Sequence, residues 1–232
     1  EDSLGEQLFV REGRRLNLTD SGRLAFRYAE DIFALGNELL DAVEGGSTSK
    51  QEMLRVGIAD VLPKFIAFQL LRPVLEMKNA PRVVCHEDKP ERLLSLLATH
   101  EVDMILSDSP SPGSIKVKAF NHFLGESQVS VMGTEALCKA SKKDFPEILD
   151  ASPVILPLPN AAVRKELERW FESRELAPRI IGELEDRALM EIFAQAGTGF
   201  IFVPQAVEEH VRKNFGLRVL GRIEEVSEEF YL

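Results

Sequence analysis

Short apolar runs alternate with stretches of helical periodicity from Leu54 onward, and this alternation constrains the fold more than any other feature. The first set places strands at residues 54–59, 82–85 and 102–106 and helices at about 64–78 and 90–100. Strands that alternate with helices at this spacing form βαβ units, and such units build a mainly parallel sheet covered by helices. The sequence therefore predicts the α/β class.

A second set of similar size follows a loop rich in serine and proline at residues 107–114. It places strands at 129–132, 154–156, 179–182 and 200–203, helices at 161–175 and 187–196, and a strand-like tail at 219–232. Two successive sets of this kind predict two similar subdomains.

Composition narrows the class of protein without identifying it. With 232 residues, 44% hydrophobic and 28% charged, the chain is ordinary for a soluble globular protein. No run reaches the length of a membrane span, and no signal-peptide pattern opens the chain. Cys85 and Cys138 are far apart and lack a CxxC spacing, which favours buried thiols in a reducing, cytoplasmic compartment over a bridge or a metal site. A net charge of −10 argues against nucleic-acid binding by the bulk of the chain.

The first 22 residues carry a small basic hairpin that leads into a helix. Leu8–Arg11 and Leu16–Leu18 have strand character, the intervening turn contains Gly13, and Thr19 suits a helix N-cap. The basic side chains of the hairpin are Arg11, Arg14 and Arg15. Without its flanking pattern, this cluster would be read as a solvated turn.

A long helix is predicted from Thr19 to about Glu44, because no proline interrupts this range. Its apolar residues recur every three or four positions and form one seam. The seam comprises Leu24, Tyr28, Ile32, Leu35 and Leu39. The expected partner is the same helix in a second copy of the chain, and the alternative is packing on its own domain. Gly45–Ser49 is predicted to form a flexible hinge.

The spacing of these N-terminal residues resembles the end of the winged helix-turn-helix in LysR-type transcriptional regulators. The matching positions are Glu1, Leu4, Gly5, Leu8, Phe9, Arg11, Arg14, Leu18, Thr19 and Gly22. The resemblance implies that residues 1–18 are a remnant of the wing and that 19–46 form the linker and dimerisation helix. Most of the base-reading domain would then lie upstream of this fragment. Arg11, Arg14 and Arg15 would contact DNA phosphates, which dominate the affinity of such a hairpin.

The remainder of the chain resembles the effector domain of the same family. Residues 196–204, AGTGFIFVP, match a family segment of the form AGxGI-x3-P. The resemblance implies a two-lobed fold like that of periplasmic binding proteins, with subdomain I at 52–127 and 225–232 and subdomain II at 128–224. It also implies a homodimer or homotetramer that binds DNA and a small effector, without a membrane or a cofactor. Several stretches, including VGIADVLPK and GELEDRALMEIF, resemble sodium-responsive activators of antiporter genes.

Polar residues at the predicted strand ends are the candidate effector contacts, because ligands of α/β folds bind at the carboxyl ends of strands. The candidates are Asp60, Val61, Ser107, Asp108, Asn160, Glu185, Asp186 and Gly199. Helix capping is the alternative for Asp60, Asn160 and Asp186, and an Asx turn is the alternative for Asp108.

The charge of these strand ends separates two classes of effector. An anion pocket would supply arginine or lysine, whereas carboxylates suit a small hard cation with oxygen ligands. Asp60, Asp108 and Asp186 are therefore candidate cation ligands, although no motif defines a metal site. Sodium or lithium is the ion that the resemblance implies, and a small organic acid is the alternative. The four histidines are scattered and are predicted to lie near the surface without a ligand role.

Enzyme motifs are missing from the sequence. It has no GxSxG, no HExxH and no phosphate loop, so we predict that the chain is not an enzyme. A stand-alone solute-binding module would share the two-lobed fold but would not carry the N-terminal hairpin and helix. The sequence therefore predicts the effector-sensing and dimerisation region of a LysR-type regulator that activates antiporter genes in response to sodium or a related cation.

Overall fold

The computed structural model describes residues 4–12, 15–43, 52–111, 119–140 and 142–232. The chain divides into two compact units, Glu1–Gln51 and Glu52–Leu232, which are described separately. None of the helices in the described ranges is long and apolar enough to span a membrane.

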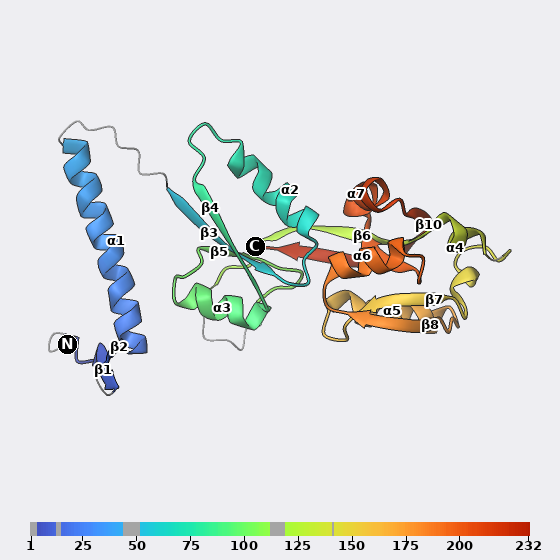
Figure 1. Ribbon diagram of the computed structural model, residues 1–232, viewed down its shortest axis with the longest axis horizontal. Helices are drawn as coiled ribbons and strands as arrows, with labels where there is room; N and C mark the ends of the chain where they lie inside the picture. The colour runs from blue at the N-terminus through green and yellow to red at the C-terminus, as the bar shows by residue number, and fades with distance from the viewer. Residues whose placement is uncertain (1–3, 13–14, 44–51, 112–118, 141) are drawn as a thin grey trace. The chain divides into compact units, whose positions relative to one another are not determined.

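The first unit is the predicted hairpin and helix (Figure 1). Strands β1 (Phe9–Glu12) and β2 (Arg15–Leu18) pair antiparallel, and helix α1 (Asp20–Val43) follows. The structure confirms Thr19 as the N-cap of α1, because its Oγ1 accepts a hydrogen bond from the Gly22 N–H at 2.9 Å. A Cβ on Gly22 would overlap the Leu8 carbonyl, so glycine lets the hairpin approach the first turn of the helix.

The predicted seam of α1 is exposed within this unit. Leu24, Tyr28, Ile32, Leu35 and Leu39 have relative accessibilities between 40% and 67%. Phe26 and Phe33 are also exposed, on the opposite side of the helix at 100° per residue. The predicted hinge Gly45–Ser49 and Arg14 lie outside the described residues.

The second unit begins with a lobe built on the parallel sheet β4-β3-β5. This first lobe contains β3 (Met53–Ala59), α2 (Lys64–Leu75), β4 (Arg82–Asp88), α3 (Pro90–Ala98) and β5 (Met104–Leu106). Residues 56–59 of the central strand β3 are buried. Leu93 of α3 packs against Gly57, where an added Cβ would come within 3.1 Å of the leucine side chain. The first predicted βαβ set is therefore confirmed.

The second lobe combines parallel and antiparallel pairing. It contains α4 (Glu135–Lys139), the 3₁₀ turn η1 (Glu147–Leu149), β7 (Pro153–Pro157), α5 (Ala162–Ser173), β8 (Arg179–Leu184), α6 (Arg187–Gln195), β9 (Ile201–Pro204) and α7 (Gln205–Phe215). Strands β7 and β8 pair parallel, whereas β9 pairs antiparallel with β6 (Phe123–Gly133). The parallel pairing predicted for the first set recurs here between β7 and β8 and at the Val154–Phe200 bridge, but β6 enters this lobe from the first lobe and runs against the direction of β9.

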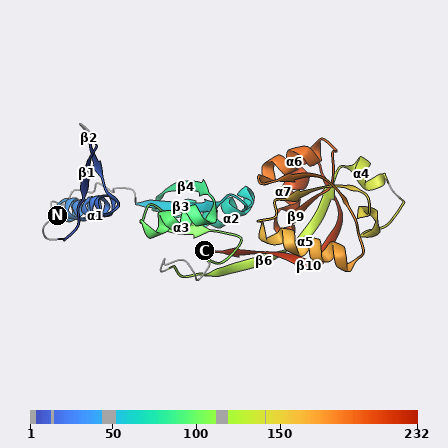
Figure 2. The ribbon, with the colours of Figure 1, turned by 90° about the horizontal axis from the view of Figure 1, so that it is seen from below.

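A two-stranded ribbon of β6 and β10 (Arg218–Tyr231) connects the lobes, and Figure 2 shows the two strands side by side. Their register changes between Ile223 and Ser227, where β10 carries extra residues and the ribbon bends. At its far end, Tyr231 exchanges two backbone hydrogen bonds with Ser107 beyond β5, at 2.9 and 3.0 Å. We propose that the subdomain boundaries at 127–128 and 224–225 coincide with this bend.

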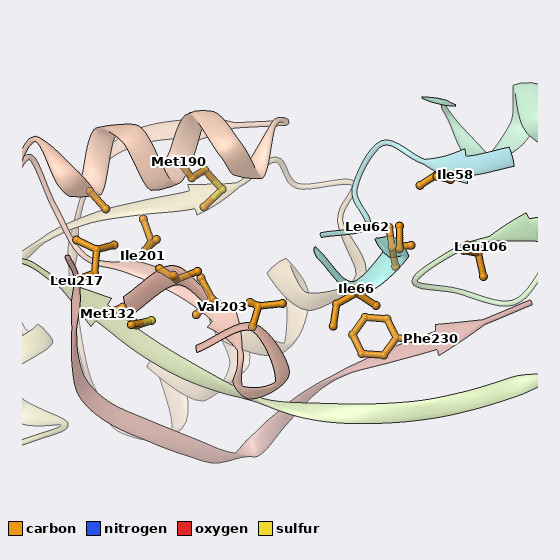
Figure 3. Close-up of a cluster of buried hydrophobic side chains, with 14 of the residues drawn as sticks. Ile58, Leu62, Ile66, Leu106, Met132, Met190, Ile201, Val203, Leu217 and Phe230 are labelled. Carbon is orange, nitrogen blue, oxygen red and sulfur yellow. The ribbon is translucent and has the colours of Figure 1, made fainter. Parts of the chain in front are cut away.

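One apolar cluster extends across both lobes (Figure 3). It includes Ile58, Leu62 and Ile66 from the first lobe and Met190 and Val203 from the second. A second cluster, around Trp170 and Phe171, lies within the second lobe. The lobes are thus joined by buried apolar contacts as well as by the ribbon.

The two cysteines lie in different lobes. Cys138 in α4 is half-buried, but Cys85 is exposed in β4, at the edge of the β4-β3-β5 sheet. The prediction of buried thiols is wrong for Cys85, which opens the stretch Cys85–Asp88 of β4 where successive side chains on both faces of the strand are exposed.

Close packing at the ribbon yields a stability prediction. A Cβ on Gly221 would overlap the Phe145 ring, so Gly221→Ala should cost about 1–3 kcal/mol by overpacking and lower Tm by several degrees. Gly182→Ala is the matched control, because its Cβ would meet only Ile155 at 3.9 Å. Thermal unfolding followed by circular dichroism tests this, and equal Tm values for the two variants would contradict it.

Candidate effector-binding site

A cavity of about 960 Å³ extends along β5, from Asp103 at its amino end to the carboxyl ends of β3 and β5. The turn after β3 contributes Asp60 and Val61, and the loop after β5 contributes Ser107 and Asp108. Asn160, just ahead of α5, joins them from the second lobe. These are the strand ends at which α/β folds bind ligands.

The cavity lining combines apolar side chains with an excess of acidic ones. Leu94 and Leu97 of α3 and Met104 and Ile105 of β5 form the apolar part. The charged lining residues are Asp60, Lys89, Glu91, Asp103 and Asp108, which amount to four carboxylates against one ammonium. This balance favours a cationic or neutral ligand over an anion.

Five of the eight predicted effector contacts line this cavity, namely Asp60, Val61, Ser107, Asp108 and Asn160. Glu185 does not line it but lies close, because its Oε1 is 3.4 Å from the Lys89 Nζ at the cavity wall. Sequence reasoning missed Lys89, which follows β4 without a motif of its own.

Asp186 and Gly199 do not line the cavity. Asp186 is the N-cap of α6, and its Oδ1 accepts a hydrogen bond from the Leu189 N–H at 2.9 Å. Gly199 lies at the amino end of β7, where an added Cβ would come within 3.0 Å of the Pro153 carbonyl oxygen. Its role is close packing at the end of the strand opposite the cavity.

Helix capping does not explain Asp60 and Asn160, the other two candidates that precede helices. The N-cap of α2 is Pro63 and that of α5 is Ala161, and neither helix has a side-chain cap. The Asp60 carboxylate instead accepts a hydrogen bond from the neighbouring Val61 N–H at 2.9 Å. Asp108 accepts a local hydrogen bond from the Ser109 hydroxyl at 3.3 Å.

The electrostatic surroundings of Asp60 disfavour its charge. Burial raises the pKa of this carboxyl above its ordinary value, and the nearby Glu185 carboxylate raises it further. The Val61 N–H, Lys89 and Lys64 act in the opposite direction without cancelling the shift. A cation in the cavity would therefore stabilise the ionised form of the Asp60 carboxyl.

The candidate cation ligands do not form a metal cage. Over the described ranges, no group of three histidine, cysteine, aspartate or glutamate residues is arranged to hold a metal ion. Asp186 is also occupied as a helix cap. His100 and His122 line the cavity, which scattered positions in the sequence could not indicate.

Two arginines with little exposure were also missed: Arg164 is buried, and the Arg187 side chain is 14% exposed. Arg164 of α5 donates to the Pro157 carbonyl at 2.8 Å and to Glu183 at 2.6 Å, so it joins the carboxyl ends of β7 and β8. Arg187 of α6 donates to the Val61 carbonyl and to Glu228 of the ribbon. The sequence analysis assigned neither arginine a role. Arg164 is buried within the second lobe, whereas Arg187 is enclosed where that lobe meets the first lobe and the ribbon.

Comparison with known proteins assigns the class. Residues 47–232 match the family model of the LysR substrate binding domain. The transcriptional activator protein NhaR of Escherichia coli strain K12 is 31% identical over 231 residues, which cover 100% of this chain and 75% of NhaR. The chain therefore belongs to the LysR family, whose members are transcriptional regulators and not enzymes.

Solved structures share the mixed α/β regulatory-domain fold. The crystal structure of CbnR, a LysR family transcriptional regulator, superposes with a TM-score of 0.64 at 18% identity, covering 99% of this chain and 79% of CbnR. DarR of Vibrio fischeri, solved in complex with DNA, has a TM-score of 0.61 at 15% identity and covers 99% and 78%. Members of the family bind DNA and small effectors and form oligomers, and this chain contains the effector-binding region.

The raised pKa of Asp60 predicts how stability depends on pH. Because the folded chain holds this proton more tightly than the unfolded chain, stability falls as pH rises from the ordinary value of 3.8 through the raised one. Asp60→Asn keeps the acceptor for Val61 and should raise Tm at pH 7 by about 1–3 °C. The gain should shrink at pH values below 3.8.

Asp103→Asn is the matched control for this titration. Asp103 lines the same cavity, but its carboxylate accepts the Arg55 N–H at 2.7 Å and pairs with the Arg55 guanidinium. The amide that replaces this carboxylate in Asp103→Asn should not stabilise the chain at pH 7. Thermal melts of both variants between pH 3 and pH 8 would contradict the assignment if Asp60→Asn were destabilising throughout.

Proposed function

We propose that this chain is the effector-sensing and dimerisation region of a cytoplasmic LysR-type activator that responds to a small cation, sodium or lithium. The observation that carries the proposal is the acidic lining of the cavity, with four carboxylates and one lysine. The similarity to NhaR, at 31% identity over the whole chain, supports an activator of the same kind.

The proposed ligands are the carboxylates of Asp60 and Asp108 with neutral oxygens from Ser107 and Asn160, all of which line the cavity. Carboxylates that share an empty cavity repel one another, and a hard cation with oxygen ligands relieves that repulsion. A cation that binds one arrangement of the lobes more tightly shifts the population toward it. Target genes would respond to that shift.

A small organic effector is the second candidate, and the size of the cavity favours it. About 960 Å³ far exceeds the needs of a bare ion and falls within the range of about 300–1,000 Å³ that is usual for small-molecule sites. Leu94 and Leu97 would contact its apolar part, and Lys89 could pair with an acidic group.

The proposed cation site is tested by comparing the Tm of the chain in sodium chloride with its Tm in potassium chloride at equal ionic strength. Sodium at ten times its Kd should stabilise the chain by about 1.4 kcal/mol, because it binds only the folded state. Asp108→Asn should remove most of this shift by deleting one ligand charge. Asp144→Asn, an exposed change outside the cavity, should leave it intact.

Two outcomes would contradict the cation. Equal shifts in sodium and potassium, together with stabilisation by a small organic acid, would establish the second candidate. An undiminished sodium shift in Asp108→Asn would remove Asp108 from the site.

The long helix α1 is proposed to pair with a second copy through its exposed seam. Ile32→Glu combined with Leu35→Glu would place unpaired charge in that interface and should convert a dimer to a monomer in light scattering. Phe26→Glu is the control, because Phe26 is equally apolar and exposed on the opposite side of α1. A monomeric parent chain, or a dimer that survives the double change, would contradict this role.

We also propose that the hairpin is the remnant of a wing, with residues 1–18 followed by the linker helix at 19–46. Arg11 is exposed on β1 and is free to approach DNA phosphates in a regulator that carries the whole winged domain. Arg14 and Arg15 are proposed to act with it.

A further inference from the structure

Arg187 belongs to the second lobe and contacts both the first lobe and the ribbon. It begins helix α6 in the second lobe, and its Nε donates to the Val61 carbonyl of the first lobe at 2.9 Å. Its Nη2 donates to Glu228 Oε2 on the ribbon at 2.6 Å. The side chains of Arg187 and Glu228 are only 14% and 3% exposed.

Glu228 holds this guanidinium in place. The second carboxylate oxygen, Oε1, is buried and has no hydrogen-bond partner within the described ranges. The charged groups that act on Glu228 are Arg187, Asp108 and Glu166, and only Arg187 among them favours its ionised form. Burial raises the pKa of Glu228, and Arg187 acts against this shift, so removal of Arg187 would leave the buried carboxyl without its counter-charge.

Val61 connects this arginine to the cavity. Its N–H donates to the Asp60 carboxylate at 2.9 Å, and its carbonyl accepts from Arg187. A ligand that draws the Asp60 carboxylate toward itself would weaken the bond from the Val61 N–H. The Val61 peptide would then turn, and its carbonyl would shift against the Arg187 guanidinium.

We propose that Arg187 is a positioning residue that couples the state of the Asp60 carboxylate to the second lobe through Val61. The inference rests on the proposed function only in taking Asp60 as an effector contact. Anchored on Glu228, the guanidinium presents its Nε to the turn, and a displaced turn moves α6 relative to the first lobe.

Other contacts between the lobes are less suited to this role. The Lys89–Glu185 pair is 62% and 40% exposed, so solvent screens it strongly. Phe65 of α2 stacks on His210 of α7 with ring centroids 4.1 Å apart, but neither residue lines the cavity. The apolar packing of α2 against the second lobe does not require Arg187, so a variant at this position keeps the lobes joined.

The distance between the lobes gives a direct test by electron paramagnetic resonance. Cys85 of β4 is exposed in the first lobe, and Lys139 of α4 is 74% exposed in the second. Spin labels at Cys85 and at Lys139→Cys, with Cys138→Ser to remove the other thiol, report the separation of the lobes in the whole chain.

The perturbation is Asp60→Ala, which removes the acceptor of the Val61 N–H without any effector. We expect it to shift or broaden the distance distribution in the parent chain, and the shift to be lost in Arg187→Lys. Lysine keeps a cation beside Glu228 but lacks the fork that reaches both partners. Arg174→Lys is the matched control, because Arg174 pairs with Glu225 of the ribbon and not with the first lobe, and the shift should persist there.

Three outcomes would overturn the coupling: no shift from Asp60→Ala, a shift unchanged in Arg187→Lys, or a shift equally lost in Arg174→Lys. If Arg187→Lys does not fold, Arg187→Gln with Glu228→Gln removes both charges together and takes its place. Sodium chloride against potassium chloride on the labelled parent chain is a separate measurement. Coupling in the mutants without a sodium response would refute the cation proposal and leave this inference standing.

Discussion

The antiparallel pairing of β6 with β10 is the interaction on which the second unit depends. The ribbon belongs to the β10-β6-β9 sheet at one end and bridges to Ser107 of the first lobe at the other. It carries Glu228 to Arg187 and Phe230 into the apolar cluster shared by both lobes. The backbone hydrogen bonds of the two strands thus connect the lobes, together with the shared apolar cluster.

Charged side chains in the second unit differ in sign between its enclosed positions and its cavity. Arg164 and the largely enclosed Arg187 each donate to a carboxylate and to a backbone carbonyl, which is the condition for removing a guanidinium from water at acceptable cost. Around the cavity the balance reverses, and carboxylates outnumber the single lysine. A site that concentrates negative charge beside an arginine-held junction is well placed to link ligand binding to the arrangement of the lobes.

Sequence reasoning grouped the polar strand ends better than it separated their individual roles. The rule that ligands bind at strand ends grouped Asp60, Ser107, Asp108 and Asn160, and these residues line one cavity. It could not separate Asp186, which caps α6, from Asp60, which does not cap α2, because both precede a helix in the sequence. Helix α7 escaped prediction because its two buried valines, Val207 and Val211, give too short a periodic pattern among charged residues.

Local patterns in the sequence by themselves determined the class of this protein. Hairpin, capped helix and two α/β sets follow from periodicity, turn residues and capping, which act between neighbours along the chain. Only the tertiary structure decided which polar groups meet, because Val61, Arg187 and Glu228 are far apart in sequence and become partners when the ribbon joins the lobes. Burial and hydrogen-bond partnership belong to the packed molecule, and no linear spacing encodes them.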